Sequence, residues 1–549
     1  MARNLRVGIQ RGLRQSIGGG FGTGDIFTLS PASFDFSRTN TKDSRITFTR
    51  ASTGTYVGAD GLIKTTPVNF ALNSNSVQGS SIGTAIPNST ESVVSPRGIT
   101  ETVRRLGRDV PAGGAQTWRV GSTSGGTPNT TYTISFFAKT VSGGTTSINV
   151  DINDAAPSSG QAATITGEWT RIVKTGGSRP NNLRFFDMNM VTATEDFYVF
   201  GAQIEIGTVA TDYIPTGSTI SGAPRFDHDP ATGESLGLLM EKAATNILLK
   251  SEKMNEWVVG NGSSVTANQA VAPDGTTTAD RVQHGSGGSS WIRQDILTVG
   301  KTYTASVYAK AVTPGTNNRF TIDLGSFPTL GDFIATDQWQ RFSFTFTALN
   351  NRFYLNNGDD SFATDVYFWG AQGEEGLFAT SYIPTDSSSV TRATDTAEIT
   401  GTNFSSFFNQ SAGTIFADNA YTGLNSFDFV LDFSDGTTDN RHSLFYLTTA
   451  NPRTLRARTR VSTDQSALEV AIPASGVFAK TAYAYASNNF AVSSAGSSVL
   501  TDSTGSIPTI NQLSIGATHA NGAPYSGHIK RIAYFPTRVD NTTLQKITS

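Results

Sequence analysis

The residue types that carry hydrolytic or metal chemistry are sparse in this sequence. Its 549 residues include five histidines and no cysteine. No two histidines have the spacing of a metal site, and no Gly-x-Ser-x-Gly turn or phosphate-binding loop occurs. The lack of cysteine excludes disulfides, thiolate metal sites and thiol catalysis. We therefore expect no bound metal, no cofactor and no enzyme activity.

Acidic side chains offer two further kinds of chemistry. Hydrolysis of a glycoside needs two carboxylates at a suitable separation, and Glu205 with Glu374 or Glu375 could supply them. Each of these glutamates lies beside an apolar strand, where a structural pairing with Arg or Lys is a sufficient explanation. The run Asp227-His228-Asp229 is explained in the same way, as a turn flanked by proline and glycine.

A calcium site is the other possibility that acidic residues raise. Asp432, Asp435 and Asp439 surround a glycine turn, and carboxylate oxygens are the ligands that calcium prefers. A solvated loop explains the same three residues. The sequence leaves calcium binding at this turn open.

Aromatic side chains point to sugar binding. A pyranose has an apolar face that stacks on an aromatic ring and a polar rim that needs hydrogen bonds. Trp118 and Trp291 occupy matching places in two copies of an internal repeat, and Trp257 has no counterpart in the first copy. These three tryptophans are the candidate carbohydrate-binding residues, and a core or interface role is the alternative for each.

Composition narrows the class of protein. Charged residues make up 15% of the chain, the net charge is −3, and there are 55 glycines. With no basic excess we expect no nucleic-acid partner, and with no long apolar run we expect no membrane insertion. Few charges combined with many aromatic, Gly, Ser and Thr residues favour strands and tight turns.

An internal duplication organises most of the chain. Residues 132–141 (YTISFFAKTV) match 303–312 (YTASVYAKAV), and a Trp-x-Arg motif follows in each copy at Trp169 and Trp339. Each copy then continues with an aromatic Gly-Ala-Gln strand and closes on Tyr-Ile-Pro-Thr. The segments alternate apolar and polar residues and show no helical period, which predicts an antiparallel sandwich.

In this order, the repeated motifs resemble the jelly-roll modules related to carbohydrate-binding families four and nine, in the form found in tailed-phage virion proteins. The resemblance implies two tandem jelly-roll β-sandwiches, module 1 at 68–220 and module 2 at 246–400. Residues 50–63 and 224–241 resemble a two-part signature of phage fibre, spike and tail proteins. We expect them to form a hairpin platform, 46–67 plus 221–245, into which module 1 is inserted.

The last part of the chain, 401–549, lacks the repeat. Its segments 413–418, 483–493 and 527–536 resemble the concanavalin-A-like or laminin-G-like sandwich that often ends such phage proteins. Asn488 and Asn489 predict a hairpin turn, and 540–547 predict one or two helical turns. The expected fold is all-β: two jelly rolls, a C-terminal sandwich and a short N-terminal arm.

Residues 1–45 are expected to be a docking arm and its linker. The arm carries four arginines and an apolar stripe at every fourth position, which predicts a short amphipathic helix before a glycine-rich connection. The virion-docking residues are Arg3, Leu5, Arg6, Ile9, Arg11, Leu13, Arg14 and Ile17. A disordered tail and an organelle transit peptide are the alternatives.

Together these features predict a phage virion structural protein, a fibre, spike or tail appendage on the outside of the particle. We expect a homo-oligomer, most simply a trimer, that contacts other virion proteins through the arm and binds host-surface glycans. The alternatives are a purely structural capsid or tail protein without a ligand, and a surface-polysaccharide depolymerase. The glycan and the position on the virion stay open.

Overall fold

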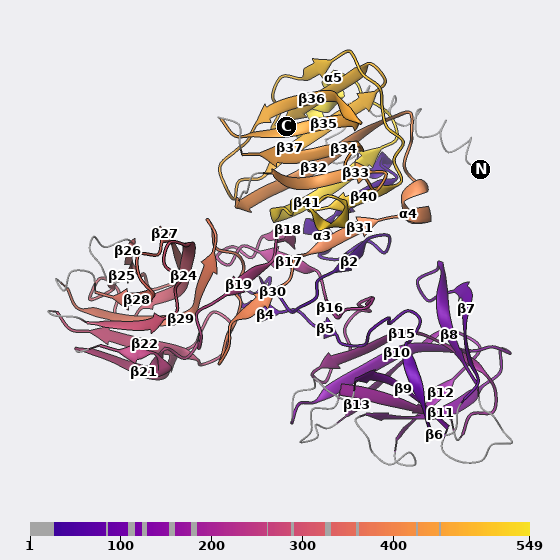
Figure 1. The fold of residues 1–549 in the computed structure, drawn as a ribbon, viewed down its shortest axis with the longest axis horizontal. Coiled ribbons are helices and arrows are strands. Elements are labelled where there is room, and N and C mark those ends of the chain that lie inside the picture. Colours follow the sequence, from indigo (N-terminus) through magenta and orange to yellow (C-terminus); the bar gives the residue numbers. More distant parts are fainter. Residues whose placement is uncertain are drawn as a thin grey trace. The chain divides into compact units, whose positions relative to one another are not determined.

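The computed structural model is almost entirely β-structure (Figure 1). Strands account for 53% of it and helices for 5%, which confirms the all-β prediction. It describes residues 27–83, 86–107, 116–122, 129–152, 160–176, 184–190, 192–260, 262–286, 290–323, 331–357, 362–423, 427–448 and 452–549. No described helix is long and apolar enough to span a membrane.

The chain forms two compact units. Unit 1 contains the residues up to Ile46, then Gly54–Thr65 and Pro224–Ser549, and unit 2 contains Thr47–Thr53 and Thr66–Ala223. Unit 2 thus holds module 1, and its main segment interrupts the sequence of unit 1. The two ends of that segment lie together, because Val68 pairs with Gly222 and Asn69 with Ser221.

Module 1 is a sandwich of two antiparallel sheets. The strand order is β13-β10-β15-β8-β7 in one sheet and β12-β11-β14-β9-β6 in the other. The strands of unit 2 are β2 (Thr47–Thr49), β5 (Val68–Asn69), β6 (Gly79–Gly83), β7 (Asn88–Val94), β8 (Thr100–Leu106), β9 (Gln116–Ser122), β10 (Tyr132–Thr140), β11 (Thr146–Ile152), β12 (Gln161–Ile165), β13 (Thr170–Gly176), β14 (Arg184–Asn189), β15 (Phe197–Ile206) and β16 (Ser221–Gly222).

Module 2 has the same topology. Its sheets run β27-β24-β29-β22-β21 and β26-β25-β28-β23-β20, which is strand for strand the order of module 1. Its elements are η2 (Met254–Glu256), β20 (Val258–Val259), β21 (Ser263–Ala270), β22 (Ala279–His284), β23 (Trp291–Asp295), β24 (Thr302–Ala311), β25 (Arg319–Asp323), β26 (Gly331–Ile334), β27 (Gln340–Thr347), β28 (Arg352–Asn356) and β29 (Thr364–Glu375). β19 (Ala244–Asn246) and β30 (Val390–Arg392) pair where the chain enters and leaves it.

The duplication includes side-chain hydrogen bonds as well as strands. The Asn69 amide donates to the carbonyl oxygens of Ala202 and Ile214 at 2.9 and 2.8 Å, and Asn246 makes the equivalent bonds at 3.1 and 2.8 Å. Such buried amides satisfy backbone groups that no strand partner reaches. The motif Tyr-Ile-Pro-Thr recurs because its backbone is held by these bonds.

The C-terminal sandwich fills the rest of unit 1. One sheet runs β17-β18-β41-β32-β37-β38-β39 with β1 also on β41, and the other contains β31-β40-β33-β34-β35-β36. The elements are η1 (Phe27–Leu29), β1 (Ala32–Asp35), α3 (Phe36–Thr39), β3 (Thr55–Val57), β4 (Ile63–Thr65), β17 (Arg225–His228), β18 (Ser235–Met240), β31 (Thr396–Ile399), α4 (Gly401–Ser405), β32 (Ala412–Gly423), β33 (Phe427–Ser434), β34 (Asn440–Leu447), β35 (Thr454–Val461), β36 (Thr463–Ala471), β37 (Ala479–Ala486), β38 (Asn489–Ser494), β39 (Leu500–Asp502), β40 (Gln512–Ile515), η3 (His519–Asn521), β41 (Ser526–Phe535) and α5 (Asn541–Thr548).

Three segments lie in this sandwich that the sequence boundaries put elsewhere. The platform hairpin β17-β18 extends its first sheet through the pair Leu238 and Ile529. β31, expected in module 2, pairs with β40 instead. β1, expected in the arm and linker, pairs with β41 and buries Ala32 and Phe34. Alternate residues of β1 are buried, as in any half-buried strand.

Two local predictions for the C-terminal sandwich are confirmed. Asn488 adopts a positive φ of 54° at the turn between β37 and β38, a conformation that asparagine tolerates. α5 forms at the end of the chain and is capped by Asp540, whose carboxylate accepts from the backbone N–H of Thr543.

Candidate functional site

One sheet of module 2 carries a polar and aromatic outer face. Side chains alternate between the two faces of a strand, and Ile292 of β23, Leu355 of β28 and Ile322 of β25 are fully buried in the module core. Their neighbours therefore point away from the core. We call this set the Trp291 face: Trp291, Arg293, Thr321, Asp323, Tyr354 and Asn356.

Two aromatic rings and a guanidinium group gather on this face. The rings of Trp291 and Tyr354 meet edge to face, with centroids 5.5 Å apart and planes at 86°. Cζ of Arg293 lies 4.6 Å from the centroid of the Trp291 ring. Trp291 is half-buried, and the backbone at Gly260 comes so close to its indole that a Cβ there would lie 2.5 Å from Cε2. The indole is therefore held in a defined position.

Trp291 differs from the other tryptophans in its hydrogen bonding. The chain has six tryptophans, and the indole N–H of Trp291 makes no hydrogen bond to a described residue, nor is it among the buried unpaired atoms. It therefore remains available to a solvent molecule or a ligand. The other five donate to the chain: Trp118 to Val77, Trp169 to Val94, Trp257 to Lys250 and Trp339 to Val271 backbone oxygens, and Trp369 to Oγ1 of Thr278.

Linked polar groups form the floor of the Trp291 face. Oγ1 of Thr321 donates to Oδ1 of Asn356, and Nδ2 of Asn356 donates to Asp323 at 3.1 Å. All three side chains are buried. Because each is fixed by its neighbour, amide and carboxylate groups stand at set positions beside the aromatic pair.

Module 1 carries a related but different face. In the strand registers, Asn189 and Asp151 correspond to Asn356 and Asp323, and Arg119 corresponds to Arg293. The residue in the place of Trp291 is Thr117. Arg119 forms an ion pair with Asp187 at 2.6 Å. The aromatic part of the Trp291 face is thus absent from the described strands of module 1.

The predicted match of Trp118 with Trp291 differs from the strand registers by one residue. Trp118 pairs with Met188, and both side chains point into the core of module 1, where Trp118 is 4% exposed. A shift of one residue along a strand moves a side chain to the opposite face. Trp257, 6% exposed, likewise packs in the core of module 2 against Phe353. Of the three candidate tryptophans, the structure puts one on an outer face.

The glutamates considered for hydrolysis hold turns. Oε1 of Glu374 accepts from the Thr380 hydroxyl at 2.6 Å and Oε2 from its backbone N–H at 2.9 Å. Glu205 is bound in the same way by Thr211. Both glutamates are buried, and their partners are threonines where Arg or Lys was expected. Glu375 is exposed and paired with Lys301.

The acidic groups considered for metals have separate partners. Asp229 accepts from the backbone N–H of Ala231 at 2.9 Å, which makes the expected turn. Asp432 accepts from Ser443, Asp435 from Thr437, and Asp439 contacts Arg460. In the described part of the chain no three His, Asp or Glu residues are arranged to hold a metal ion. The arm residues Arg3 to Ile17 lie outside the described residues.

Comparisons with known proteins identify no family for this chain. No protein-family model matches it, and no curated protein matches it. Among solved structures it is similar to the CBM40 domain of the Ruminococcus gnavus IT-sialidase bound to alpha2,3 sialyllactose, at 15% identity and a TM-score of 0.24, over 27% of this chain and 88% of that one.

Two further solved structures are similar over longer stretches. The tandem CBM22-1 and CBM22-2 domains of Paenibacillus barcinonensis Xyn10C match at 11% identity and a TM-score of 0.22, over 56% of this chain and 97% of that one. Domains LG4-5 of the mouse laminin alpha1 chain match at 10% identity and a TM-score of 0.19, over 55% and 94%. These neighbours are β-sandwich domains, and at such identities and TM-scores they assign no ligand to this chain.

Proposed function

We propose that this protein is an external structural component of a tailed phage that binds a host-surface glycan through the Trp291 face of module 2. The observation that carries the glycan-binding part is the unpaired indole N–H of Trp291 beside Tyr354. The virion part is supported by the order of the repeated motifs and the two-part platform signature in the sequence.

The Trp291 face has the chemistry that sugar binding needs. Aromatic rings offer apolar contact to the C–H groups of a sugar, and the fixed amide and carboxylate of Asn356 and Asp323 stand beside them for its hydroxyls. The indole N–H adds a donor that no described residue uses. A purely structural face would pair this donor, as the other five tryptophans do.

The test is binding of the full-length protein to an array of bacterial surface polysaccharides. For any glycan that binds, Trp291→Phe removes the indole donor and part of the ring. We expect affinity to fall about tenfold, equivalent to about 1.4 kcal/mol. Trp291→Ala should abolish binding on the array.

Trp339→Phe is the matched control. It also removes an indole donor, but that donor is bonded to the Val271 carbonyl in the other sheet of the module. The control should leave affinity unchanged. Equal losses in both variants would mean that the effect is structural. If no surface polysaccharide binds the unmodified protein, the glycan-binding function is wrong and the purely structural alternative stands.

A further inference from the structure

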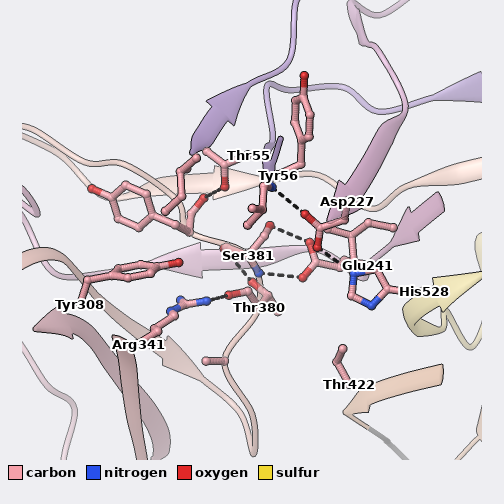
Figure 2. Close-up of a pocket in the computed structure, with 15 residues that line it drawn as sticks. Thr55, Tyr56, Asp227, Glu241, Tyr308, Arg341, Thr380, Ser381, Thr422 and His528 are labelled. Atoms are coloured by element: carbon pink, nitrogen blue, oxygen red, sulfur yellow. Dashed lines mark hydrogen bonds and ion pairs between the residues drawn. The ribbon is translucent and has the colours of Figure 1, made fainter. Parts of the chain in front are cut away.

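A small cavity within unit 1 lies away from the Trp291 face. It has a volume of about 180 Å³ and is lined by the platform, module 2 and the C-terminal sandwich. Figure 2 shows Tyr56 and Asp227 from the platform, Tyr308 and Arg341 from module 2, and His528 from β41 around it. We call it the Tyr308 pocket. It is smaller than the sites that hold drug-sized ligands.

The charged groups in its wall already have partners. The Glu241 carboxylate accepts from the backbone N–H and the hydroxyl of Ser381, each at 2.7 Å. Asp227 accepts from the backbone N–H of Val57 at 2.6 Å and lies 2.8 Å from Nε2 of His528. The wall therefore offers no unpaired carboxylate to a cation.

The one guanidinium group that lines the pocket is also engaged. Arg341 donates to the carbonyl oxygen of Thr380 at 2.6 Å and to the hydroxyl of Ser306 at 2.9 Å. Its Cζ lies 5.5 Å from the centroid of the Tyr308 ring. In module 1, Arg171 makes the same bonds to Thr211 and Ser135. Arg341 thus repeats a structural role of the duplicated fold, and the pocket holds no free cation for an anion.

Tyr308 supplies the polar group that has no partner. Its hydroxyl makes no hydrogen bond to a described residue and points into the pocket in Figure 2. Burial raises the pKa of Tyr308 above its ordinary value, against the opposing charge of Arg341, so the hydroxyl stays a neutral donor. The corresponding residue of module 1 is Phe137, over whose ring Arg171 lies at 5.7 Å. Packing at this position therefore needs the ring and has no need of the hydroxyl.

The remaining lining is a mixture of hydroxyl and apolar groups. Thr55, Thr380, Ser381 and Thr422 bring hydroxyls, and Ile63, Leu239 and Ala379 bring apolar surface. A neutral ligand with several hydroxyls and exposed C–H groups matches this wall better than an ion does. We propose that the Tyr308 pocket binds one neutral sugar ring, with the Tyr308 hydroxyl donating a hydrogen bond to it.

The test uses the full-length protein and free monosaccharides. Saturation-transfer NMR with D-glucose, D-galactose and N-acetyl-D-glucosamine, with glycerol as a small polyol for comparison, reports binding at millimolar concentrations. Tyr308→Phe installs the residue that module 1 already has, so the fold is preserved. We expect it to weaken binding of the bound monosaccharide at least fivefold, and Thr422→Trp, which fills the cavity, to abolish it.

Trp291→Ala separates this site from the Trp291 face. Monosaccharide binding that survives Trp291→Ala but falls in Tyr308→Phe supports the pocket, whether or not polysaccharides bind elsewhere. Binding that is lost in Trp291→Ala and unchanged in Tyr308→Phe overturns it. Absence of any monosaccharide signal in the unmodified protein also overturns it, and leaves the polysaccharide array as the separate test of the Trp291 face.

Discussion

His442 is enclosed between the sheets of the C-terminal sandwich. Its ring stacks on Tyr485 with centroids 3.8 Å apart, and Nδ1 lies 2.7 Å from Oγ1 of Thr459. Burial lowers the pKa of His442 from its ordinary value to about 3. The folded protein therefore holds this imidazole neutral throughout the physiological range.

Acid should destabilise the C-terminal sandwich through His442. In the unfolded chain the imidazole takes up a proton below about pH 6.5, while the folded state resists protonation until about pH 3. Stability from this group is complete above pH 6.5 and falls as the pH decreases toward 3. Between pH 7 and pH 5 the loss should be about 2 kcal/mol. Hydrogen exchange of β34 and β35 at the two pH values measures it.

The control for this prediction is His442→Gln, which removes the titrating group. The unmodified protein should lose more protection on acidification than the variant does. If the two lose the same amount, carboxylates govern the acid response and His442 has no part in it.

Single residues also mark how far the sequence alone could reach. The alternating pattern around Trp291 predicts a strand, and this is confirmed, but alignment of the two copies by residue type pairs Trp118 with Trp291. Only the strand register reveals that their side chains lie on opposite faces. The free hydroxyl of Tyr308 was equally hidden, because Tyr and Phe are interchangeable in a packing pattern and the pocket is built from segments distant in sequence.

Four charged side chains connect β17, β18 and the segment around β30. Arg225, fully buried, donates to Glu241 at 2.6 Å and also to Asp395. Arg392 adds a contact with Glu241 at 3.4 Å. Although burial alone would raise the pKa of Glu241, Arg392 and Arg225 hold it well below its ordinary value. The platform is thus joined to the end of module 2 by a compact ionic cluster.

Breaking this cluster should be costly. Arg225→Met leaves the carboxylates of Glu241 and Asp395 buried without their main counter-charge, and we expect unit 1 to lose about 3–5 kcal/mol of stability. Denaturant unfolding, followed by hydrogen exchange of β18, measures the loss. A loss in Arg225→Met below about 1 kcal/mol would mean that water reaches the cluster.

Arg319→Met is the comparison within the same unit. It breaks the Arg319–Asp332 pair, whose side chains are 47% and 45% exposed. Solvent screens such a pair, so its loss should cost less than about 1 kcal/mol.

At the level of elements, local patterns predicted most strands but not their partners. The repeat motifs predict both jelly rolls, and the apolar end of the 224–241 segment predicts β18. That β18 would pair with β41, almost 300 residues later, depends on long-range packing that no local pattern encodes. β1 is four residues long, and its pattern is too short to separate from a linker.

The whole molecule gives a test of the proposed attachment. Phe27 packs on Phe416 with ring centroids 4.7 Å apart, so a truncation that spares the fold must end before it. We expect the chain without residues 1–26 to melt as the full chain does and to sediment, like it, as a trimer of the 58.2 kDa protein. It should fail to enter phage particles, because we propose that the arm provides the attachment.

Two outcomes would contradict this prediction. Normal occupancy of the truncated protein in particles would place attachment elsewhere, with the C-terminal sandwich as the next candidate. Sedimentation of the full chain as a monomer, at concentrations that preserve the fold, would rule out the trimer.

The adjacent ends of module 1 have a genetic consequence. Val68 and Gly222 are paired, and Arg50 secures the junction by donating to Oγ1 of Thr66 at 2.6 Å and to the Ala223 carbonyl at 2.9 Å. A recombination event with breakpoints at these two positions would exchange residues 68–222 for another domain whose termini are equally close. Unit 1 would keep its own sheets through such an exchange, so lineages could replace this outer surface as a cassette while they inherit the rest unchanged.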